Sequence, residues 1–476
     1  MNILFLISEV EDIIKTGGLA DVGKALPLAL AERGHKIKIV LPYYKQVAAD
    51  FALADAMPKQ SIHIHQQHYE FGVKQLSLHD LDVYLVDHPY FSENATPYSE
   101  DASSNAQRFA FFSLAALKIA SELNFQPDLV HTHDWHTAIA NYFVKSDFIA
   151  RHAVIADDQF FAKSKTVITI HNAAFQGVCA LSRVPILDDF SHSQVNTDNG
   201  YLNLLKTGIS YADKVCPVSP TYAQEIKSMV GSHGIFDVIN QAPYKVTGVL
   251  NGCDYTQWDP SNDPLIPHNF SLSNMTGKEK CKVALQKKSK LKALKTVPLF
   301  GMVCRATQQK GFAYLMPMLA ELFEHKVQLV IMGTGDVSIT AELKELAKQY
   351  PEQFAFIEAF SPEWAHLIEA GSDFFLMPSE FEPCGLNQMY SLAYGTLPVV
   401  RSVGGLADTV IDASDAEGNG FVFLDPSSEA LLSCLRRVLL LTKEQPKLLQ
   451  QMQTRAMQKR FTWQQAAKEY EQVYTS

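Results

Sequence analysis

Hydrophobic and polar residues alternate along the chain in a pattern that predicts parallel βαβ units, because short apolar runs are followed by longer stretches with helical spacing. In the first half, the predicted strands cover residues 3–8, 36–41, 83–87, 129–132, 166–170 and 214–218. In the second half, they cover residues 299–304, 328–332, 354–357, 374–377 and 397–401. The expected fold class is therefore α/β, with two Rossmann-like doubly wound domains that face a central cleft.

The two groups of strands also predict where the domains divide. The junction is expected near residues 241–251, so that the first domain covers residues 1–245 and the second covers residues 246–459. A last helix within residues 460–476 lies well beyond the final predicted strand. In such sheets, ligands bind at the carboxyl ends of the strands, so the turns there are the first place to look for chemistry.

Composition and charge exclude several classes of protein. With 47% apolar and 19% charged residues, the chain is an ordinary globular protein. Binding to nucleic-acid phosphates needs a concentrated basic surface, and the chain has a net charge of −10, so no nucleic-acid partner is expected. No stretch approaches the roughly 18–20 apolar residues that span a bilayer, and no membrane partner is expected. Seven cysteines without a CxxC pair indicate a reducing compartment, and the expected location is cytoplasmic.

The first predicted turn is a candidate anion site. Lys15, Gly17 and Gly18 come after the first strand and before a helix. Two glycines would permit a backbone that points free amides at an anion, and the lysine adds a cation. A tight turn with a solvent-exposed lysine remains the alternative. The nearby GLADVGKA run resembles a nucleotide phosphate loop, but Ala25 has no hydroxyl for Mg²⁺, which argues against a nucleoside triphosphatase.

The second half offers a stronger anion site. Arg305 and Lys310 follow a predicted strand and precede a helix, so together they could stabilise a departing diphosphate without a metal, although an exposed surface pair is the alternative. The later run SEFEPCGLNQ holds Glu380 and Glu382 in a loop, and the amides of Gly385 and Leu386 would bind an anion at the start of the next helix.

Other polar residues lie at strand ends in the first half. The run HTHDWH resembles a metallo-hydrolase motif, but its aspartate is out of register, which favours Asp134 as a carboxylate at the cleft edge over a zinc site of His131, His133 and His136. His171 and Asn172 end another strand, where they either contact a ligand or cap the next turn. Asn251 with Gly252 is ordinary turn chemistry when taken alone.

Taken together, eight ordered motifs resemble the bacterial glycogen synthase and plant starch synthase family. They are KTGGLADV, HDWH, IHNAAFQG, VLNGCDYxxWDP, RxxxQKG, GTGD, FEPCGLNQ and RSVGGLADTV, and they extend over nearly the whole chain. The resemblance implies the GT-B architecture, with the last helix packed on the first domain. It implies transfer of glucose from ADP-glucose to the non-reducing end of an α-1,4-glucan with retention of configuration, and no cofactor.

The resemblance also implies roles for individual residues. Lys15 and the amides of Gly17 and Gly18 would contact the donor phosphates from the first domain, and Arg305 and Lys310 from the second. The positions implied around the glucosyl ring are Asp134, His171, Asn251, Glu382, Cys384 and Gly385. Tyr98 and Asn172 would lie on the acceptor side. Phe360 stands where the family commonly has a tyrosine that stacks on adenine, and the ring can still stack.

Retention would ordinarily call for a second carboxylate as nucleophile. Glu380 is the nearest candidate to accompany Glu382, but residues two apart in a proline-containing loop are not expected to converge. A front-face substitution without a metal is therefore favoured. The alternatives are a synthase that uses another nucleotide sugar such as UDP-glucose, a metal-dependent hydrolase built on HTHDWH, and a glucan-binding protein without catalysis.

Overall fold

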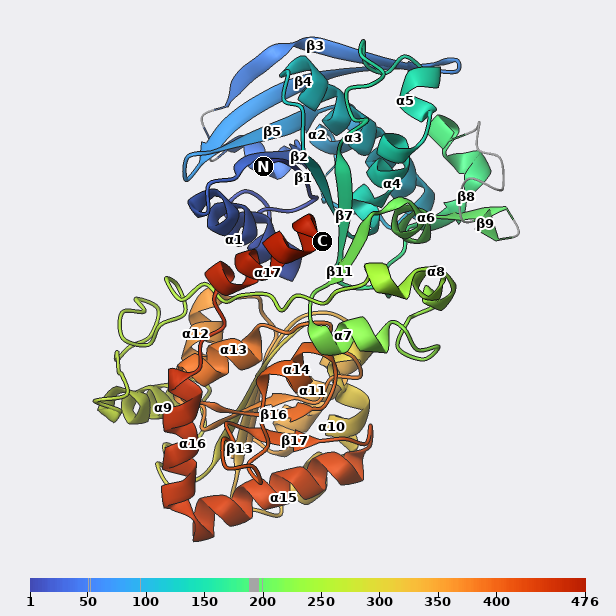
Figure 1. Ribbon diagram of the computed structural model, residues 1–476. Coiled ribbons are helices and arrows are strands. Elements are labelled where there is room, and N and C mark those ends of the chain that lie inside the picture. The colour runs from blue at the N-terminus through green and yellow to red at the C-terminus, as the bar shows by residue number, and fades with distance from the viewer. Residues whose placement is uncertain (50, 52, 95, 188–196, 199) are drawn as a thin grey trace. The chain divides into compact units, whose positions relative to one another are not determined.

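The computed structural model describes residues 1–49, 51, 53–94, 96–187, 197–198 and 200–476. The chain forms two compact units (Figure 1). The first comprises Met1–Asn251 and Trp463–Ser476, and the second comprises Gly252–Thr462. The boundary expected after residue 245 lies a few residues before this division. Among the helices of the described residues, none is long and apolar enough to cross a bilayer.

The first unit is built on an eight-stranded sheet of order β11-β7-β6-β1-β2-β5-β4-β3. Six of these strands run parallel: β1 (Asn2–Leu6), β2 (Lys36–Pro42), β5 (Leu81–Asp87), β6 (Leu129–His133), β7 (Lys165–Ile170) and β11 (Lys214–Pro217). Numbered in chain order and taken from the β5 side, they follow the doubly wound order 3-2-1-4-5-6. The strand order reverses between β1 and β6, which makes their carboxyl ends the expected ligand position.

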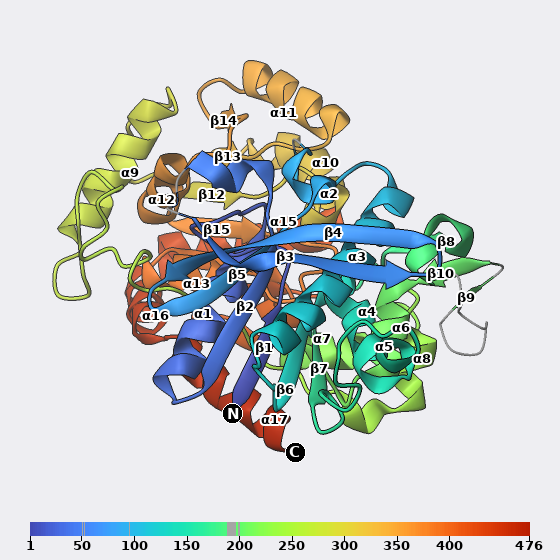
Figure 2. The ribbon, with the colours of Figure 1, turned by 90° about the horizontal axis from the view of Figure 1, so that it is seen from above.

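An antiparallel hairpin extends this sheet beyond β5. It consists of β3 (Ala54–Ile64) and β4 (Gln67–Leu78), which Figure 2 shows running side by side. The sequence analysis did not predict it, because it relied on continuous apolar runs. In β4, buried Tyr69, Phe71 and Val73 alternate with more exposed residues, which is typical of a half-buried antiparallel strand. A small separate sheet contains β8 (Val178–Ala180), β9 (Thr197–Asp198) and β10 (Tyr201–Asn203).

Helices cover both faces of the large sheet. On one face lie α1 (Gly18–Glu32) and α17 (Trp463–Thr475), which pack against each other (Figure 1). α3 (Ala102–Glu122) and α4 (Asp134–Lys145) connect strands in the opposite direction and therefore lie on the other face. The shorter helices are α2 (Pro89–Ser92), α5 (Phe148–Arg151), α6 (Leu204–Tyr211), α7 (Pro220–Glu225) and α8 (Phe236–Gln241). The C-terminal helix thus belongs to the first unit.

The second unit contains a fully parallel six-stranded sheet of order β14-β13-β12-β15-β16-β17. Its strands are β12 (Leu299–Val303), β13 (Gln328–Met332), β14 (Phe354–Ile357), β15 (Phe374–Met377), β16 (Leu397–Arg401) and β17 (Phe421–Phe423). The order is again 3-2-1-4-5-6, with the reversal between β12 and β15. Two Rossmann-like sheets confirm the predicted α/β class.

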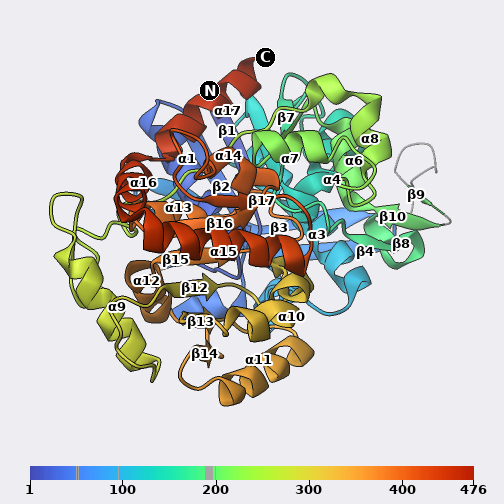
Figure 3. The same ribbon diagram turned by 90° about the horizontal axis from the view of Figure 1, so that it is seen from below.

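Each face of the second sheet buries its own apolar cluster. Side chains of α10 (Phe312–Leu322), α11 (Val337–Gln349), α15 (Ser428–Glu444) and α16 (Pro446–Gln458) pack with Phe300, Leu329 and Leu376. Figure 3 views this unit from the side of α15 and α16. On the other face, α9 (Thr276–Lys288), α12 (Pro362–Gly371) and α14 (Gly404–Thr409) pack with Val330, Phe375 and Val400. α13 (Asn387–Ala393) follows β15.

Candidate active site

Polar residues gather at the point where the strand order of the first sheet reverses. Glu9 follows β1, Asp134 follows β6 and His171 follows β7, and these three strands are neighbours. Because the strands are parallel, their carboxyl ends lie at one edge of the sheet. The structure therefore brings together residues that the sequence analysis placed at separate strand ends.

Glu9 organises this edge, and the sequence analysis did not single it out. The residue is only 3% exposed. It accepts hydrogen bonds from the Thr16 amide at 2.5 Å, the Thr16 hydroxyl at 2.5 Å, the Gly17 amide at 3.2 Å and the Tyr98 hydroxyl at 2.5 Å. One buried carboxylate thus fixes both the Lys15–Gly18 turn and Tyr98. The available signal was an acidic residue directly after an apolar strand.

The Lys15–Gly18 turn carries a cation that is paired with carboxylates. Lys15 Nζ lies 2.8 Å from a carboxylate oxygen of Glu11 and 2.8 Å from one of Asp21. Burial raises the pKa of Asp21 to about 6. Gly17 has a φ of −162°, which any residue can adopt, and a Cβ there would meet nothing within 4 Å. The expectation that Gly17 is needed for its backbone freedom is therefore wrong for this conformation.

Asp134 occupies an unusual backbone conformation at the start of α4. Its φ is +52°, in the left-handed region that aspartate tolerates better than most residues. Oδ1 accepts hydrogen bonds from the amides of His171 at 2.7 Å and Asn172 at 3.3 Å. Burial raises the pKa of Asp134 to about 7, despite these two hydrogen bonds, which lower it. Asp134 is thus a buried carboxyl group that joins the ends of β6 and β7.

The remaining predicted residues of this unit are held in different ways. His171 Nε2 lies 3.0 Å from Nδ1 of His133, and burial lowers the pKa of His171 to about 3, so its ring is neutral near pH 7. Asn172 Oδ1 accepts a hydrogen bond from the Ala174 amide at 3.0 Å, so this side chain caps the following turn. The buried Oδ1 of Asn251 has no hydrogen-bond partner among the described residues. Such an orphaned acceptor is free to bind a hydroxyl group.

The three histidines of HTHDWH do not form a metal centre in this geometry. His131 uses both ring nitrogens on the hydroxyl groups of Thr169 and Tyr474. The His131 and His133 rings are in contact at a tilt of 34°, with centroids 4.3 Å apart. Within the part of the chain that the structure describes, no group of three or more histidine, cysteine, aspartate or glutamate side chains could hold a metal ion.

In the second unit, the strand order reverses at a lysine–glutamate pair. Lys310 follows β12 and Glu382 follows β15, and Lys310 Nζ lies 2.5 Å from Glu382 Oε2. The hydroxyl of Ser379 donates to the same oxygen at 3.0 Å. Glu382 is buried, whereas Glu380 is exposed. The two glutamates therefore occupy different environments.

The backbone locks this pair in place. Gly311, at the start of α10, has a φ of +79°, and a Cβ there would lie 1.8 Å from the Pro378 carbonyl oxygen. The Glu380 amide donates to the Gln309 carbonyl at 2.8 Å, and Gln309 Nε2 donates to the Phe381 carbonyl at 3.2 Å. Only glycine fits this close approach of the Lys310 turn to the Glu382 loop.

Further predicted residues lie around the same sheet edge. Arg305 is exposed, and its guanidinium has no ion pair or hydrogen bond among the residues described. Phe360 follows β14 with 83% of its surface exposed, so its ring is open to stacking. Cys384 is buried, and Gly385 has a φ of +72°. Leu386 directly precedes α13.

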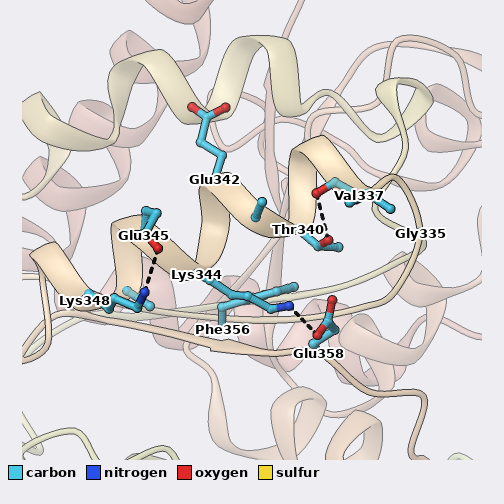
Figure 4. Close-up of a pocket in the computed structure, with 11 residues that line it drawn as sticks. Gly335, Val337, Thr340, Glu342, Lys344, Glu345, Lys348, Phe356 and Glu358 are labelled. Carbon is cyan, nitrogen blue, oxygen red and sulfur yellow. Dashed lines mark hydrogen bonds and ion pairs between the residues drawn. The ribbon is translucent and has the colours of Figure 1, made fainter.

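A separate pocket of about 750 Å³ lies beside α11 and β14 (Figure 4). Lys344 forms an ion pair with Glu358 there, at 2.6 Å, and Lys348 pairs with Glu345 on the same helix, also at 2.6 Å. None of the residues predicted from the sequence to form the site lines it. Because the pocket contains none of these predicted residues, the Lys310–Glu382 edge is the better candidate site.

Two families match the two halves of the chain. Residues 2–241 match a family described as "Starch synthase catalytic domain", and residues 284–459 match one described as "Glycosyl transferases group 1". Both agree with the resemblance in the sequence motifs.

Full-length relatives agree as well. The chain is 46% identical to a glycogen synthase of Vibrio parahaemolyticus and 44% identical to one of Aeromonas salmonicida, with 100% of this chain and 98% of each relative covered. Among solved structures, the catalytic domain of starch synthase IV from Arabidopsis thaliana, bound to ADP and acarbose, matches with a TM-score of 0.90 at 28% identity, covering 100% of this chain and 98% of that one. The chain therefore belongs to the glycogen and starch synthase family and is a glycosyltransferase with the GT-B architecture.

Proposed function

We propose that this enzyme transfers glucose from ADP-glucose to the non-reducing end of an α-1,4-glucan with retention of configuration. The observation that carries the proposal is the Lys310–Glu382 pair at the strand reversal of the second sheet, with the unpaired Arg305 on the same loop. The relative solved with ADP and acarbose supports a nucleotide diphosphate and a glucan as ligands.

The cations would stabilise the leaving group. Breaking the bond between glucose C1 and the diphosphate leaves about two to three negative charges on ADP, and fixed cations in a water-poor site stabilise them strongly. Arg305 and Lys310 supply this charge in the second unit. Lys15 and the amides of Gly17 and Gly18 would contact the same diphosphate, which requires Lys15 to leave Glu11 and Asp21 and Gly17 to give up its weak bond to Glu9. Phe360 would stack on the adenine.

The polar side chains would hold the sugars. Asp134, His171, Asn251 and Glu382 would bind hydroxyl groups of the transferred glucose, beside Cys384 and Gly385. The Leu386 amide would belong to the anion site at the start of α13. Tyr98 and Asn172 would lie on the acceptor side. Because His171 is neutral near pH 7, it would act as a hydrogen-bond partner rather than as a cation.

The transfer step follows from this arrangement. The C1–oxygen bond to the diphosphate breaks with its electron pair passing to the phosphate oxygen, and the acceptor 4-hydroxyl attacks C1 from the same face. The hydroxyl proton moves to the departing phosphate. That Glu382 is bound to Lys310 and Ser379, and that Glu380 is exposed, supports a step in which neither acts as a nucleophile. The reaction would need no metal or other cofactor.

Labelled ADP-glucose and glycogen primer in EDTA test the proposal. We expect labelled polymer and one ADP per glucose transferred, with the new linkage in the α configuration by NMR. Greater incorporation from UDP-glucose than from ADP-glucose would overturn the assigned donor in favour of the alternative nucleotide sugar. Bound zinc in stoichiometric amount, together with loss of transfer in EDTA, would instead support the metal-dependent alternative.

A further inference from the structure

A line of buried rings and hydroxyl groups connects the C-terminal helix to His171. The Tyr474 hydroxyl lies 3.0 Å from His131 Nδ1. His131 Nε2 lies 2.7 Å from the Thr169 hydroxyl, which lies 3.3 Å from the Tyr470 hydroxyl. All of these side chains are buried. Two tyrosines of α17 therefore occupy both ends of the hydrogen-bonding system around His131.

The line continues from His131 to the candidate site. The His131 and His133 rings are in tilted contact, with centroids 4.3 Å apart, and the Phe5 ring packs against both, with centroids 5.1 and 4.3 Å away. His133 Nδ1 then lies 3.0 Å from His171 Nε2. The rings of His131, His133 and His171 are thus in consecutive contact.

The hydrogen-bond partners of the three histidine rings indicate which nitrogen of each ring carries the proton. The Tyr474 hydroxyl has no second partner in the described part of the chain, so it donates to His131, whose proton then sits on Nε2 and faces Thr169. The buried Nε2 of His133 has no partner among the described residues. Because unpaired buried N–H groups are rare, the His133 proton sits on Nδ1 and is donated to His171 Nε2. His171 therefore carries its own proton on Nδ1.

We propose that Tyr470 and Tyr474 are positioning residues for catalysis, which hold His171 through His131 and His133 as an Nδ1–H donor toward a sugar oxygen. The inference rests on the proposed role of His171 in binding the glucosyl group. The C-terminal helix α17 would then contribute to catalysis as well as to the packing of the first unit.

The first test compares two substitutions on the same helix. Tyr474→Phe removes one hydroxyl group and keeps the packed ring, so we expect kcat to fall about fivefold, the effect of one neutral hydrogen bond, with both KM values unchanged. Glu471→Gln is the control, because Glu471 pairs with Arg33 and His35, and neither of these residues lies in the line from Tyr474 to His171. It should lower the melting temperature and leave kcat unchanged. An unchanged kcat in Tyr474→Phe overturns the proposal.

A double-mutant cycle with His171→Asn distinguishes an effect of Tyr474 through His171 from a general destabilisation of the protein. If Tyr474 acts through His171, Tyr474→Phe should have almost no further effect on kcat in the His171→Asn background. The same fivefold loss in both backgrounds overturns the inference. Full turnover in His171→Asn alone would overturn the proposed function of His171 itself, which distinguishes the two failures.

An independent measurement covers the case in which Tyr474→Phe is too unstable for kinetics. Histidine-selective ¹⁵N labelling reports which ring nitrogen carries the proton. In the wild type, we expect Nδ1–H at His171, and we expect Tyr470→Phe to change the His171 signals. A wild-type His171 with its proton on Nε2, or signals unmoved in Tyr470→Phe, contradicts the proposal.

Discussion

At the scale of single residues, Glu9 illustrates how one buried carboxylate can prepare a site without touching a reacting atom. It accepts hydrogen bonds from two hydroxyl groups and two amides. These donors belong to the turn expected to hold the donor phosphates and to Tyr98 on the expected acceptor side. Losing the carboxylate should therefore affect both substrates.

For Glu9→Gln, we expect higher KM values for donor and acceptor and a loss in kcat/KM of roughly 10- to 100-fold, since hydrogen bonds to charged groups contribute about 1.5–3 kcal/mol. Steady-state kinetics with each substrate varied in turn measures this. Asp12→Asn is a matched control in the same loop, because Asp12 pairs with Lys24 and its φ of +71° suits asparagine. Equal kinetics for the two variants would contradict the role of Glu9.

Asp134 predicts a pH dependence of stability. Burial raises its folded-state pKa to about 7 from the ordinary 3.8, so the folded protein holds a proton there that the unfolded chain releases at lower pH. This contribution to stability is complete below about pH 4 and is lost as the pH rises through about 7. Urea unfolding at several pH values should show a fall in the free energy of unfolding across this window.

Asp134→Asn should remove that part of the pH dependence, because asparagine does not titrate and tolerates the left-handed backbone. A wild type and an Asp134→Asn variant with parallel stability curves between pH 4 and 7 would show that Asp134 does not titrate in this range.

At the scale of elements, two glycines at the starts of helices have opposite requirements. Gly311 has a positive φ, and any Cβ would collide with the Pro378 carbonyl, whereas Gly17 has an extended φ and open space. Gly311→Ala should lower the free energy of unfolding by more than about 2 kcal/mol and displace Lys310, and Gly17→Ala should leave stability within about 0.5 kcal/mol of the wild type. Denaturant unfolding of both variants checks this, and equal stability would refute the steric argument.

The buried strands and the polar residues at their ends are the part of the fold and site that the sequence predicted. Apolar runs such as 299–304 and 374–377 marked buried parallel strands, and the polar residues after them, Lys310 and Glu382, lie together as a result of topology. The β3–β4 hairpin was not predicted, because alternation is a weaker signal than a continuous run. Glu9 and the His131 line were not predicted either, since they depend on contacts between distant segments that no local pattern records.

At the scale of the whole molecule, the chain passes from one unit to the other twice, after Asn251 and after Thr462. Within the second unit, the residues next to these two points are hydrogen-bonded to each other. The Cys253 amide donates to the Phe461 carbonyl at 2.8 Å, and the Phe461 amide donates to the Tyr255 hydroxyl at 3.0 Å. The guanidinium of Arg460 lies over the Tyr255 ring. The C-terminal helix then continues into the first unit.

Removal of Trp463–Ser476 should therefore destabilise the first unit selectively. Its buried side chains include Trp463, Tyr470, Val473 and Tyr474. Each large apolar side chain that loses its burial costs about 1.5–3 kcal/mol, so the loss should reach several kcal/mol. Compared with the full chain, calorimetry should show the unfolding transition of the first unit at a lower temperature and that of the second unit unchanged. Two unchanged transitions would contradict the packing of α17 as part of the first core.

The central claim is that fixed cations, without a metal, carry the charge of the departing diphosphate. The most direct measurement is the turnover of Arg305→Ala and Lys310→Ala at saturating ADP-glucose and glycogen in EDTA, with Arg436→Ala, whose partner is the exposed Glu321, as the control. We predict full turnover in the wild type and the control and a loss of about 10²- to 10³-fold in each site variant. Near-normal turnover in both site variants, or a wild type that requires a divalent metal, would contradict the account.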